Sequence, residues 1–290
     1  MEPRERTLSK NEAKIILDLE WRGQRTVSPG QLRSMLGASD GYARFVAHKL
    51  VQKGWLERLR PGLYQLIPAS RGREGVADQN PLAAGAVLAD PYFFSFGTAC
   101  THHGFTEQVF AEVYIACRVR RSPRIVRGKR YVFAWERDDR FFCFEQVEVL
   151  GHTVLMATRE RALLDALDRP QHAGGIGEVS RIVCKAAPLV SWSKLIELAR
   201  QWMESALVQR LGHLLDLHGV EMPKTVRKRM LGLTLPGSKV LLGPRKTWGT
   251  GGKLDPTWGI NQNVPRDVLI GSEPRRRKVM FAPRKRLDDR

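Results

Sequence analysis

The stretch SPGQLRSMLGASDGYARFVAHKLVQKGWLERLRPGLYQLIP, residues Ser28 to Pro68, carries the start and stop signals of a short helix at its beginning. Ser28 is a good N-cap, Pro29 suits the first helical position, and Gln31 can complete a capping box. Gly37 is a suitable helix end, because glycine adopts the left-handed conformation without strain. These signals predict a short helix that ends in a tight turn.

A second helix is predicted directly after this turn, capped by Ser39 or Asp40. Its apolar residues recur at i, i+3, i+4 and i+7, the spacing of one helical face. These residues are Ala43, Val46, Ala47 and Leu50. The opposite face carries Tyr42, Arg44, His48, Lys49 and Gln52. The second helix is therefore expected to be amphipathic, with a polar and partly basic outer face.

Gly54 is expected to end the second helix, and two strand-like runs follow at residues 55–59 and 63–67. They are joined by Arg60, Pro61 and Gly62, and Pro-Gly at the central positions is typical of a type II turn. Two capped helices followed by a basic hairpin are the layout of a winged helix-turn-helix. A further helix opened by Ser9 and Glu12 would cover the helix pair and complete this unit.

This layout indicates DNA binding, with the second helix in the major groove and the hairpin near phosphate. The candidate DNA-binding residues are Arg33, Ser39, Tyr42, Arg44, His48, Lys49, Arg58 and Arg60. Arg44 could pair bidentately with a guanine edge, whereas the lysine and the hairpin arginines would contact phosphate. Two alternatives stay open: the unit docks another protein, or its basic face is only a solvated surface.

The composition supports a polyanionic partner. The chain has 290 residues, a formal charge of +18 and a pI of about 10.3, which favours nucleic acid or an anionic membrane surface. No apolar run is long enough to span a membrane, and the charged N-terminus lacks the apolar segment of a signal peptide. A cytoplasmic location without membrane contact is therefore expected. The four cysteines show no CxxC spacing and are expected to be reduced core residues.

The positive charge lies mainly at the two ends of the chain. Residues 1–68 hold 12 basic and 7 acidic side chains, residues 69–220 hold 19 and 17, and residues 221–290 hold 17 and 6. The C-terminal segment, which ends in PRRRKVMFAPRKRLDDR, thus carries most of the excess. It is expected to add non-specific affinity for DNA or to approach a phosphate-bearing substrate of a toxin, and the remaining alternative is a solvated surface.

The organisation predicted for the whole chain is α+β: a winged helix-turn-helix domain at residues 1–75, then a domain at residues 76–290 that combines an antiparallel sheet with helices. The polar segment at 69–80 is the expected linker. Aromatic and β-branched runs between residues 92 and 157 predict the sheet. Helical patterns follow to about residue 219. Only short helices or strands are expected in the basic segment after it.

Several residue clusters contain residue types that occur in metal, acid–base or phosphate-binding sites. Cys100, His102 and His103 match no established zinc spacing. Asp165 and Asp168 could pair for acid–base work, but neighbouring arginines favour ordinary ion pairing. The glycines at 174–177 follow a helix rather than a strand and lack the rest of a phosphate loop. The expected protein therefore has no catalytic residues, metal or cofactor, and is not an enzyme.

The segment GWLERLRPGLYQLIP resembles the wing of the AbiEi-type antitoxins, bacterial regulators paired with a nucleotidyltransferase toxin in type IV toxin–antitoxin and abortive-infection operons. The similarity continues in FGTACTHHGFTEQ, in TRERALLDALDRPQHAGGIGEVSRI, in RLGHLLDLHGV and in LDPTWGINQNV. These segments keep the family's order from about residue 9 to 270. The last twenty residues have no counterpart in it.

The resemblance implies an N-terminal winged helix that binds inverted repeats in its own promoter and represses its operon. It also implies a C-terminal domain that counters the toxin, usually without a stable complex. Binding as cooperative monomers and binding as a dimer are both open. The rival functions are a ligand-responsive repressor without an antitoxin role, which would need an apolar pocket, and an enzyme acting on nucleic acid, which would need clustered carboxylates or a metal site.

Overall fold

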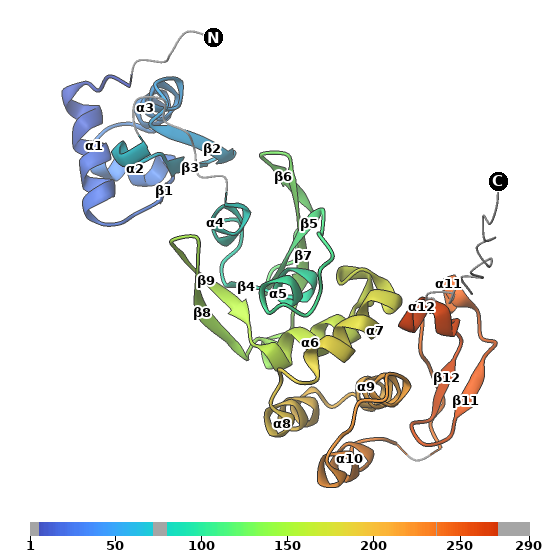
Figure 1. Cartoon of the computed structure of the whole chain (residues 1–290). Coiled ribbons are helices and arrows are strands. Elements are labelled where there is room, and N and C mark those ends of the chain that lie inside the picture. The colour runs from blue at the N-terminus through green and yellow to red at the C-terminus, as the bar shows by residue number, and fades with distance from the viewer. Residues whose placement is uncertain (1–5, 72–79, 236, 272–290) are drawn as a thin grey trace, which may run out of the picture. The chain divides into compact units, whose positions relative to one another are not determined.

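The computed structural model of the chain is a mixed α+β structure (Figure 1), and it describes residues 6–71, 80–235 and 237–271. Packing divides the chain into two compact units, residues 1–103 with 108–162 and residues 104–107 with 163–290. The linker expected at 69–80 lies largely outside the described residues, and so do residues 272–290 at the end of the basic C-terminal segment. The domain boundary near residue 75 therefore stays a prediction.

The first unit begins with a module of three helices and three short strands, which we call the N-terminal module (residues 6–71). Its helix starts are those that the sequence predicts: Ser9 with Glu12 and Ser28 with Gln31 each form a capping box. Gly37 ends the second helix in the left-handed conformation, at φ 60°. The elements are α1 (Lys10–Trp21), β1 (Thr26–Val27), α2 (Pro29–Leu36), α3 (Asp40–Gln52), β2 (Leu56–Arg60) and β3 (Leu63–Leu66).

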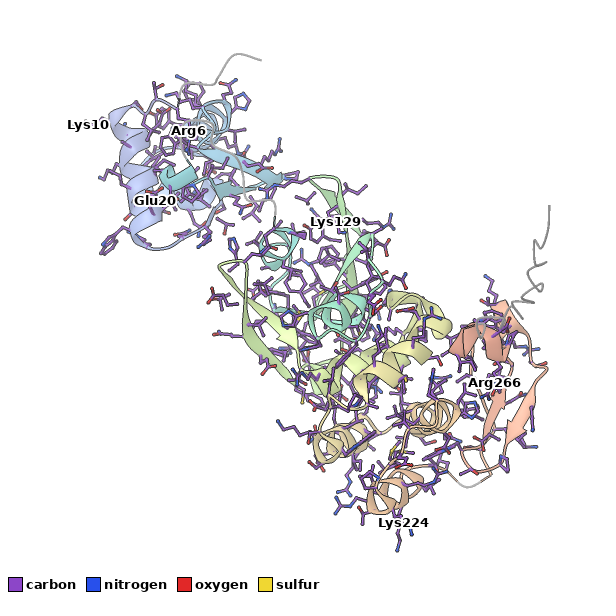
Figure 2. The ribbon with its side chains drawn as sticks, viewed as in Figure 1. Arg6, Lys10, Glu20, Lys129, Lys224 and Arg266 are labelled. Atoms are coloured by element: carbon purple, nitrogen blue, oxygen red, sulfur yellow. The ribbon has the colours of Figure 1, made fainter. Side chains whose placement is uncertain are left out.

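The N-terminal module has a hydrophobic core of its own. The core residues come from all three helices and all three strands and lie between Ile15 and Leu66 in the sequence. The strands form an antiparallel sheet in the order β1-β3-β2. Arg6 and Glu20, labelled in Figure 2, fasten the chain after β3, because Arg6 Nη2 donates to the Ile67 carbonyl at 2.6 Å and Glu20 accepts from the Ala69 N–H at 2.7 Å.

The rest of the first unit is built around a six-stranded sheet in the order β6-β7-β5-β4-β9-β8. Antiparallel pairing, which the sequence predicts throughout, is wrong for two of the five strand pairs, since β5–β7 and β4–β9 are parallel. The elements are α4 (Pro81–Ala86), β4 (Tyr92–Phe94), α5 (Phe96–His102), β5 (Glu112–Cys117), β6 (Arg124–Val126), β7 (Lys129–Trp135), β8 (Phe144–Val149) and β9 (His152–Ala157).

The direction of β7 explains the difference. After β5 the chain passes to the sheet edge, where it forms β6, and then turns back at Arg127 and Gly128 into the position beside β5 (Figure 1). Strand-like runs indicate pairing but not direction, because parallel and antiparallel strands have similar side-chain patterns when both faces are covered. The connection, rather than the residues of the strands, decides the direction.

One ion pair within the first unit joins the N-terminal module to the turn between β6 and β7. Arg127 donates Nε to Glu57 Oε1 at 2.6 Å and Nη2 to Gln65 Oε1 at 2.8 Å, and it also pairs with Glu57 Oε2. Glu57 and Gln65 are opposite each other on β2 and β3. Arg127 therefore binds both strands of this hairpin.

The second unit is mainly helical, with a small sheet in the order β10-β12-β11. Its helix α6 (Arg159–Asp168) spans the division between the two units. The other elements are α7 (Gly175–Ala186), α8 (Trp192–Trp202), α9 (Ser205–Leu217), α10 (Lys224–Leu231), β10 (Val240–Leu241), α11 (Arg245–Trp248), β11 (Lys253–Asp255), β12 (Ile260–Gln262) and α12 (Arg266–Ile270). The short pieces predicted after residue 220 are confirmed.

None of the four cysteines forms a disulfide bond, but they are not all core residues. Cys100 and Cys117 are buried as expected, whereas Cys143 is exposed and Cys184 is half-buried. Cys143 has a positive φ of 57° in the segment that leads into β8. Its exposure follows from this loop position, which residue type alone does not indicate.

Candidate nucleic-acid interface

Helix α3 is held by its cap at one end and by the core along one face. Ser39 accepts a hydrogen bond from the Tyr42 N–H at 3.3 Å, so its hydroxyl caps the N-terminus of α3. Four residues of α3 are buried in the core of the module: Ala43, Val46, Ala47 and Leu50. The opposite face of α3 consequently points to solvent.

Phe45 lies at the centre of this exposed face. A helix advances by about 100° per residue, so Gly41 and Gln52 project in nearly the same direction as Phe45. All three are exposed. Lys49 and Tyr42 lie to one side of this centre, and His48 and Arg44 lie to the other side. The structure thus places all four of these predicted residues on the solvent face of α3.

The centre of the face combines aromatic rings with a cation. The rings of Tyr42 and Phe45 have centroids 6.2 Å apart, and Lys49 Nζ lies 4.8 Å from the centroid of Phe45. Phe45 is 51% exposed, an unusual position for a phenylalanine in a small module. The sequence pattern did contain this signal, since Phe45 lies outside the buried set of α3, but the prediction considered only polar outer residues.

The remaining predicted residues of the helix pair differ in their surroundings. Arg33 of α2 pairs with Asp40 at 3.3 Å, and both side chains are exposed. His48 Nε2 lies 3.1 Å from Gln52 Nε2. Arg44 is exposed and forms no ion pair with any residue that the structure describes. Of the two arginines, Arg44 is therefore the better placed to pair with an external group.

The hairpin of β2 and β3 has the turn that the sequence predicts. Gly62 has a φ of 77°, as the third residue of a type II turn requires. Arg58 is exposed on β2 opposite Tyr64, and the register shifts between Arg58 and Arg60. Arg60 is the last residue of β2, and its side chain lies outside the described part of the structure.

Several acidic groups of the N-terminal module are bound by bases of the same module. Glu12 accepts from Lys53 at 2.6 Å, and Asp18 pairs with Arg22 at 2.9 Å. Burial opposes ionisation of Glu12, but hydrogen bonds from Lys53 and Ser9 outweigh it and hold the pKa of Glu12 below its ordinary value. These carboxylates are thus neutralised locally, which leaves the basic residues of α3 effective toward a phosphate.

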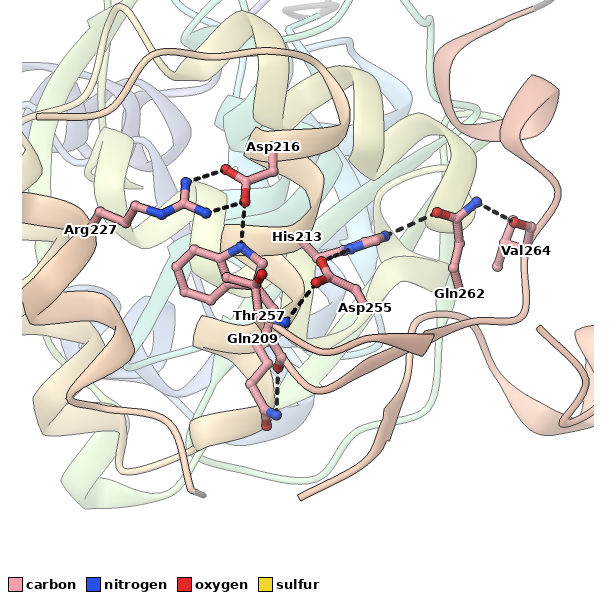
Figure 3. A network of polar contacts seen from close by, with 9 residues as sticks. Gln209, His213, Asp216, Arg227, Asp255, Thr257, Gln262 and Val264 are labelled. Atoms are coloured by element: carbon pink, nitrogen blue, oxygen red, sulfur yellow. Dashed lines mark hydrogen bonds and ion pairs between the residues drawn. The ribbon is translucent and has the colours of Figure 1, made fainter. Parts of the chain in front are cut away.

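A second polar cluster lies in the second unit, where α9 and α10 meet the residues around β11 and β12 (Figure 3). Asp216 accepts from both terminal nitrogens of Arg227, at 2.6 and 2.7 Å, and from Trp258 Nε1 at 2.7 Å. Trp258 is 1% exposed, and its ring lies so close to Gly212 that an added Cβ would meet it at 2.4 Å. Gly212 is therefore required by the packing of this ring.

His213 in the same cluster pairs with a carboxylate, as in an acid–base dyad. Its Nδ1 lies 2.8 Å from Asp255 Oδ2, but its Nε2 is also engaged, at 3.2 Å from Gln262 Oε1. The side chain is almost fully buried. A general base needs a ring nitrogen that can reach substrate, so this arrangement fastens β11 and β12 to α9 instead of forming a catalytic site.

Within residues 6–71, 80–235 and 237–271, His, Cys, Asp and Glu do not gather in groups of three or more. His102 and His103 are neighbours on α5, and His103 Nε2 lies 2.7 Å from the Ala157 carbonyl. Burial lowers the pKa of both rings. Among the same residues, no helix has the length and apolarity of a membrane span.

Most of the N-terminal module is similar in sequence to a known family. Residues 14–67 match a family model described as "Transcriptional regulator, AbiEi antitoxin". The resemblance to AbiEi-type antitoxins is thereby confirmed over most of this module, and it supports a role as a transcriptional regulator.

The fold of the chain is also similar to a solved structure, "Crystal structure of RV2827C protein from Mycobacterium tuberculosis". The two share 14% sequence identity at a TM-score of 0.60, over 89% of this chain and 93% of that chain. At this identity the similarity concerns the fold alone. No curated protein sequence matches the chain.

Proposed function

We propose that this chain is an AbiEi-type regulator whose N-terminal module is a winged helix-turn-helix that binds double-stranded DNA at inverted repeats in its own promoter. In this proposal α3 is the recognition helix, and the β2–β3 hairpin is the wing. Two observations support it: the family match over residues 14–67 and the exposed aromatic and basic face of α3, opposite the core. Binding at the promoter would repress the chain's own operon.

In this proposal different residues contact the bases and the phosphates of the DNA. Phe45, at the centre of the face, contacts the methyl group of a thymine, because contact between two apolar groups removes the surface of both from water. Arg44, exposed on the same helix, pairs with a guanine edge. Lys49, Arg33 and the wing arginines contact phosphates, which set the position of the helix without reading sequence.

We further propose that the remainder of the chain counters a nucleotidyltransferase toxin in a type IV, abortive-infection system, without a stable complex. The resemblance segments RLGHLLDLHGV and LDPTWGINQNV support this role, because they supply most of the polar cluster of Figure 3. The dyad in this cluster has no ring nitrogen available for catalysis, which favours an antitoxin over an enzyme. A neighbouring gene for a nucleotidyltransferase would support the pairing.

A ligand-responsive repressor would need a pocket suited to a small molecule. One hollow in the second unit, beside α9 and β11, has a volume of about 260 Å³, below the range of about 300–1,000 Å³ that is common for such sites. Gln209 on its wall already donates to the Trp258 carbonyl at 2.7 Å and to Ser238 Oγ at 2.8 Å. This hollow therefore does not favour the ligand-responsive alternative.

The proposal is tested by footprinting the full-length protein on its own promoter. Arg44→Ala should cost about 1–3 kcal/mol at one base position and relax specificity there. Arg60→Ala should weaken all sequences alike and lower the salt slope by about one unit. Arg22→Ala is the matched control, because Arg22 is an exposed arginine of α1 that already pairs with Asp18. A wild-type footprint without preference for the promoter would refute the proposal.

A further inference from the structure

A concentration of arginines lies at the edge of the six-stranded sheet, outside the N-terminal module. Residues 118–130, RVRRSPRIVRGKR, contain seven basic side chains and no acidic one. The near-neutral balance of residues 69–220 hides this run, because acidic residues elsewhere offset it in the count. The run forms the loop after β5, the edge strand β6 and the start of β7 (Figure 1), where Figure 2 labels Lys129.

Several of these basic groups have partners within the protein. Arg118 pairs with Asp138 at 2.5 Å, Arg130 with Glu112 at 2.9 Å, and Arg127 with Glu57. Lys129 Nζ donates to the Phe110 carbonyl at 2.9 Å. The remaining three are Arg120, Arg121 and Arg124, and none of them forms an ion pair with a described residue.

Two details show that Arg120 and Arg121 are not simply solvated. The Arg120 guanidinium lies 4.3 Å from the ring centroid of Trp135, and Trp135 is 37% exposed at the end of β7. Trp135 pairs with Cys117 across the sheet, so the ring stands beside the start of the arginine loop. Arg121 Nε is buried and has no hydrogen-bond partner among the described residues. The Arg121 side chain is therefore held against the protein and does not extend freely into solvent.

We propose that Arg120, Arg121, Arg124 and Trp135, which we call the arginine surface, bind a single-stranded segment of nucleic acid. A base stacks on the exposed Trp135–Arg120 pair, and backbone phosphates accept from Arg121 and Arg124. This site is separate from α3 and does not depend on the proposed promoter binding.

The stacking pair favours a single strand over a duplex. Bases within a duplex are stacked on their neighbours and present only their edges, whereas unpaired bases offer a face to aromatic rings and guanidinium planes. Arginine also suits the phosphates, because its planar group forms two parallel hydrogen bonds to phosphate oxygens. A double-stranded partner could use the charges but not the exposed indole.

The experiment measures binding of labelled ten-nucleotide single strands of mixed sequence, one RNA and one DNA, to the full-length protein. Trp135→Ala should weaken the bound strand roughly 5- to 150-fold, and Trp135→Phe should retain most of the affinity because it keeps an aromatic face. Arg124→Ala should lower the slope of log affinity against log salt by about 0.7. Comparison of the RNA with the DNA strand identifies which of the two is preferred.

Two variants serve as matched controls. Trp21→Ala removes an indole that is 85% exposed on α1, and Arg200→Ala removes an exposed arginine of α8. Neither substitution should change the affinity for the single strands. Every variant retains the basic C-terminal segment, so any binding by that segment is the same in all of them. The proposal is overturned if neither strand binds, if Trp135→Ala binds like the controls, or if Trp135→Ala weakens a promoter duplex as much as the single strands.

Discussion

The N-terminal module and the polar cluster of the second unit are both built from helices and short strands, but different kinds of contact hold them together. The capping boxes of the module join residues three apart in sequence, and its core is almost entirely apolar. In the cluster, side-chain bonds join α9 to residues 42 to 49 positions away, and Asp216 also pairs with Arg227, 11 positions away. The helix starts of the module are thus specified by neighbouring residues and its interior is apolar, whereas the cluster of the second unit is held by polar pairs between distant segments.

This difference has an energetic consequence. Apolar contacts tolerate small rearrangements, because they have no required direction. A partly buried charge pair is destabilised strongly when one partner is lost, because the other is left without compensation. Substitutions in the cluster should therefore destabilise the second unit and leave the N-terminal module intact.

The largest effect is expected from dividing the chain. A protein without residues 1–79 should lose promoter binding completely, because it lacks α3. A fragment of residues 1–75 retains the whole core of the module and the contacts of Arg6 and Glu20. It should fold and bind the promoter weakly. Gel shifts measure binding after circular dichroism has verified folding. A fragment that is unfolded would show that the module needs Arg127 and the sheet.

Gly212→Ala should destabilise the second unit by about 3 kcal/mol, because the new Cβ would overlap the Trp258 ring. Thermal unfolding monitored by tryptophan fluorescence measures the effect. Gly251→Ala is the matched control, since nothing lies within 4 Å of the added atom. Promoter affinity should stay unchanged in both variants. A fall in affinity with Gly212→Ala would show that the two regions are not independent.

Asp216→Asn should cost about 2 kcal/mol, because it removes a charge-assisted pair with Arg227 and weakens the acceptor for Trp258. Chemical denaturation measures this loss at neutral pH. Arg200→Lys, in an exposed and loose pair with Glu197 at 4.0 Å, should cost almost nothing.

The same carboxylate should make stability depend on pH. Burial opposes ionisation of Asp216, but hydrogen bonds from Arg227 and Trp258 hold its pKa below the ordinary value. Its stabilising contribution is therefore complete above the pKa of an unfolded aspartate and is lost as the pH falls through the lower, folded pKa. In Asp216→Asn this part of the acid dependence should be absent. Equal pH profiles for the two proteins would contradict the assignment.

The smallest effect should come from Gly41→Ala, which should raise the stability of the module but lower its affinity for the promoter. The protein leaves open space at this exposed position of α3, so alanine should stabilise the module by about 0.5–1 kcal/mol. Promoter affinity should nevertheless fall several-fold if the first turn of α3 approaches DNA closely. Gly30→Ala on α2, with only an ordinary contact at 3.9 Å, should stabilise without weakening binding.

The sequence predicted the module well because its signals are local. Caps at Ser9 and Ser28, the helix end at Gly37 and the turn at Gly62 each depend on a few neighbouring residues. The outer face of α3 was predicted only in part, since Phe45 was overlooked among polar neighbours.

The parallel strand pairs and the cluster around Trp258 could not be predicted in the same way. They depend on which distant segments meet, and a single sequence does not contain that information. The resemblance to the antitoxin family marked RLGHLLDLHGV and LDPTWGINQNV as separate motifs. The structure shows that they contact each other, through His213 with Asp255 and Asp216 with Trp258.

The close approach of Gly212 to Trp258 has a consequence for how such chains diverge. A larger residue at 212 becomes tolerable only after the indole at 258 has been replaced by something small, and the reverse order leaves a cavity. The two positions should therefore change together over evolutionary time. Among distant relatives, a chain that has kept only one member of the pair should have lost this attachment of the small sheet to α9.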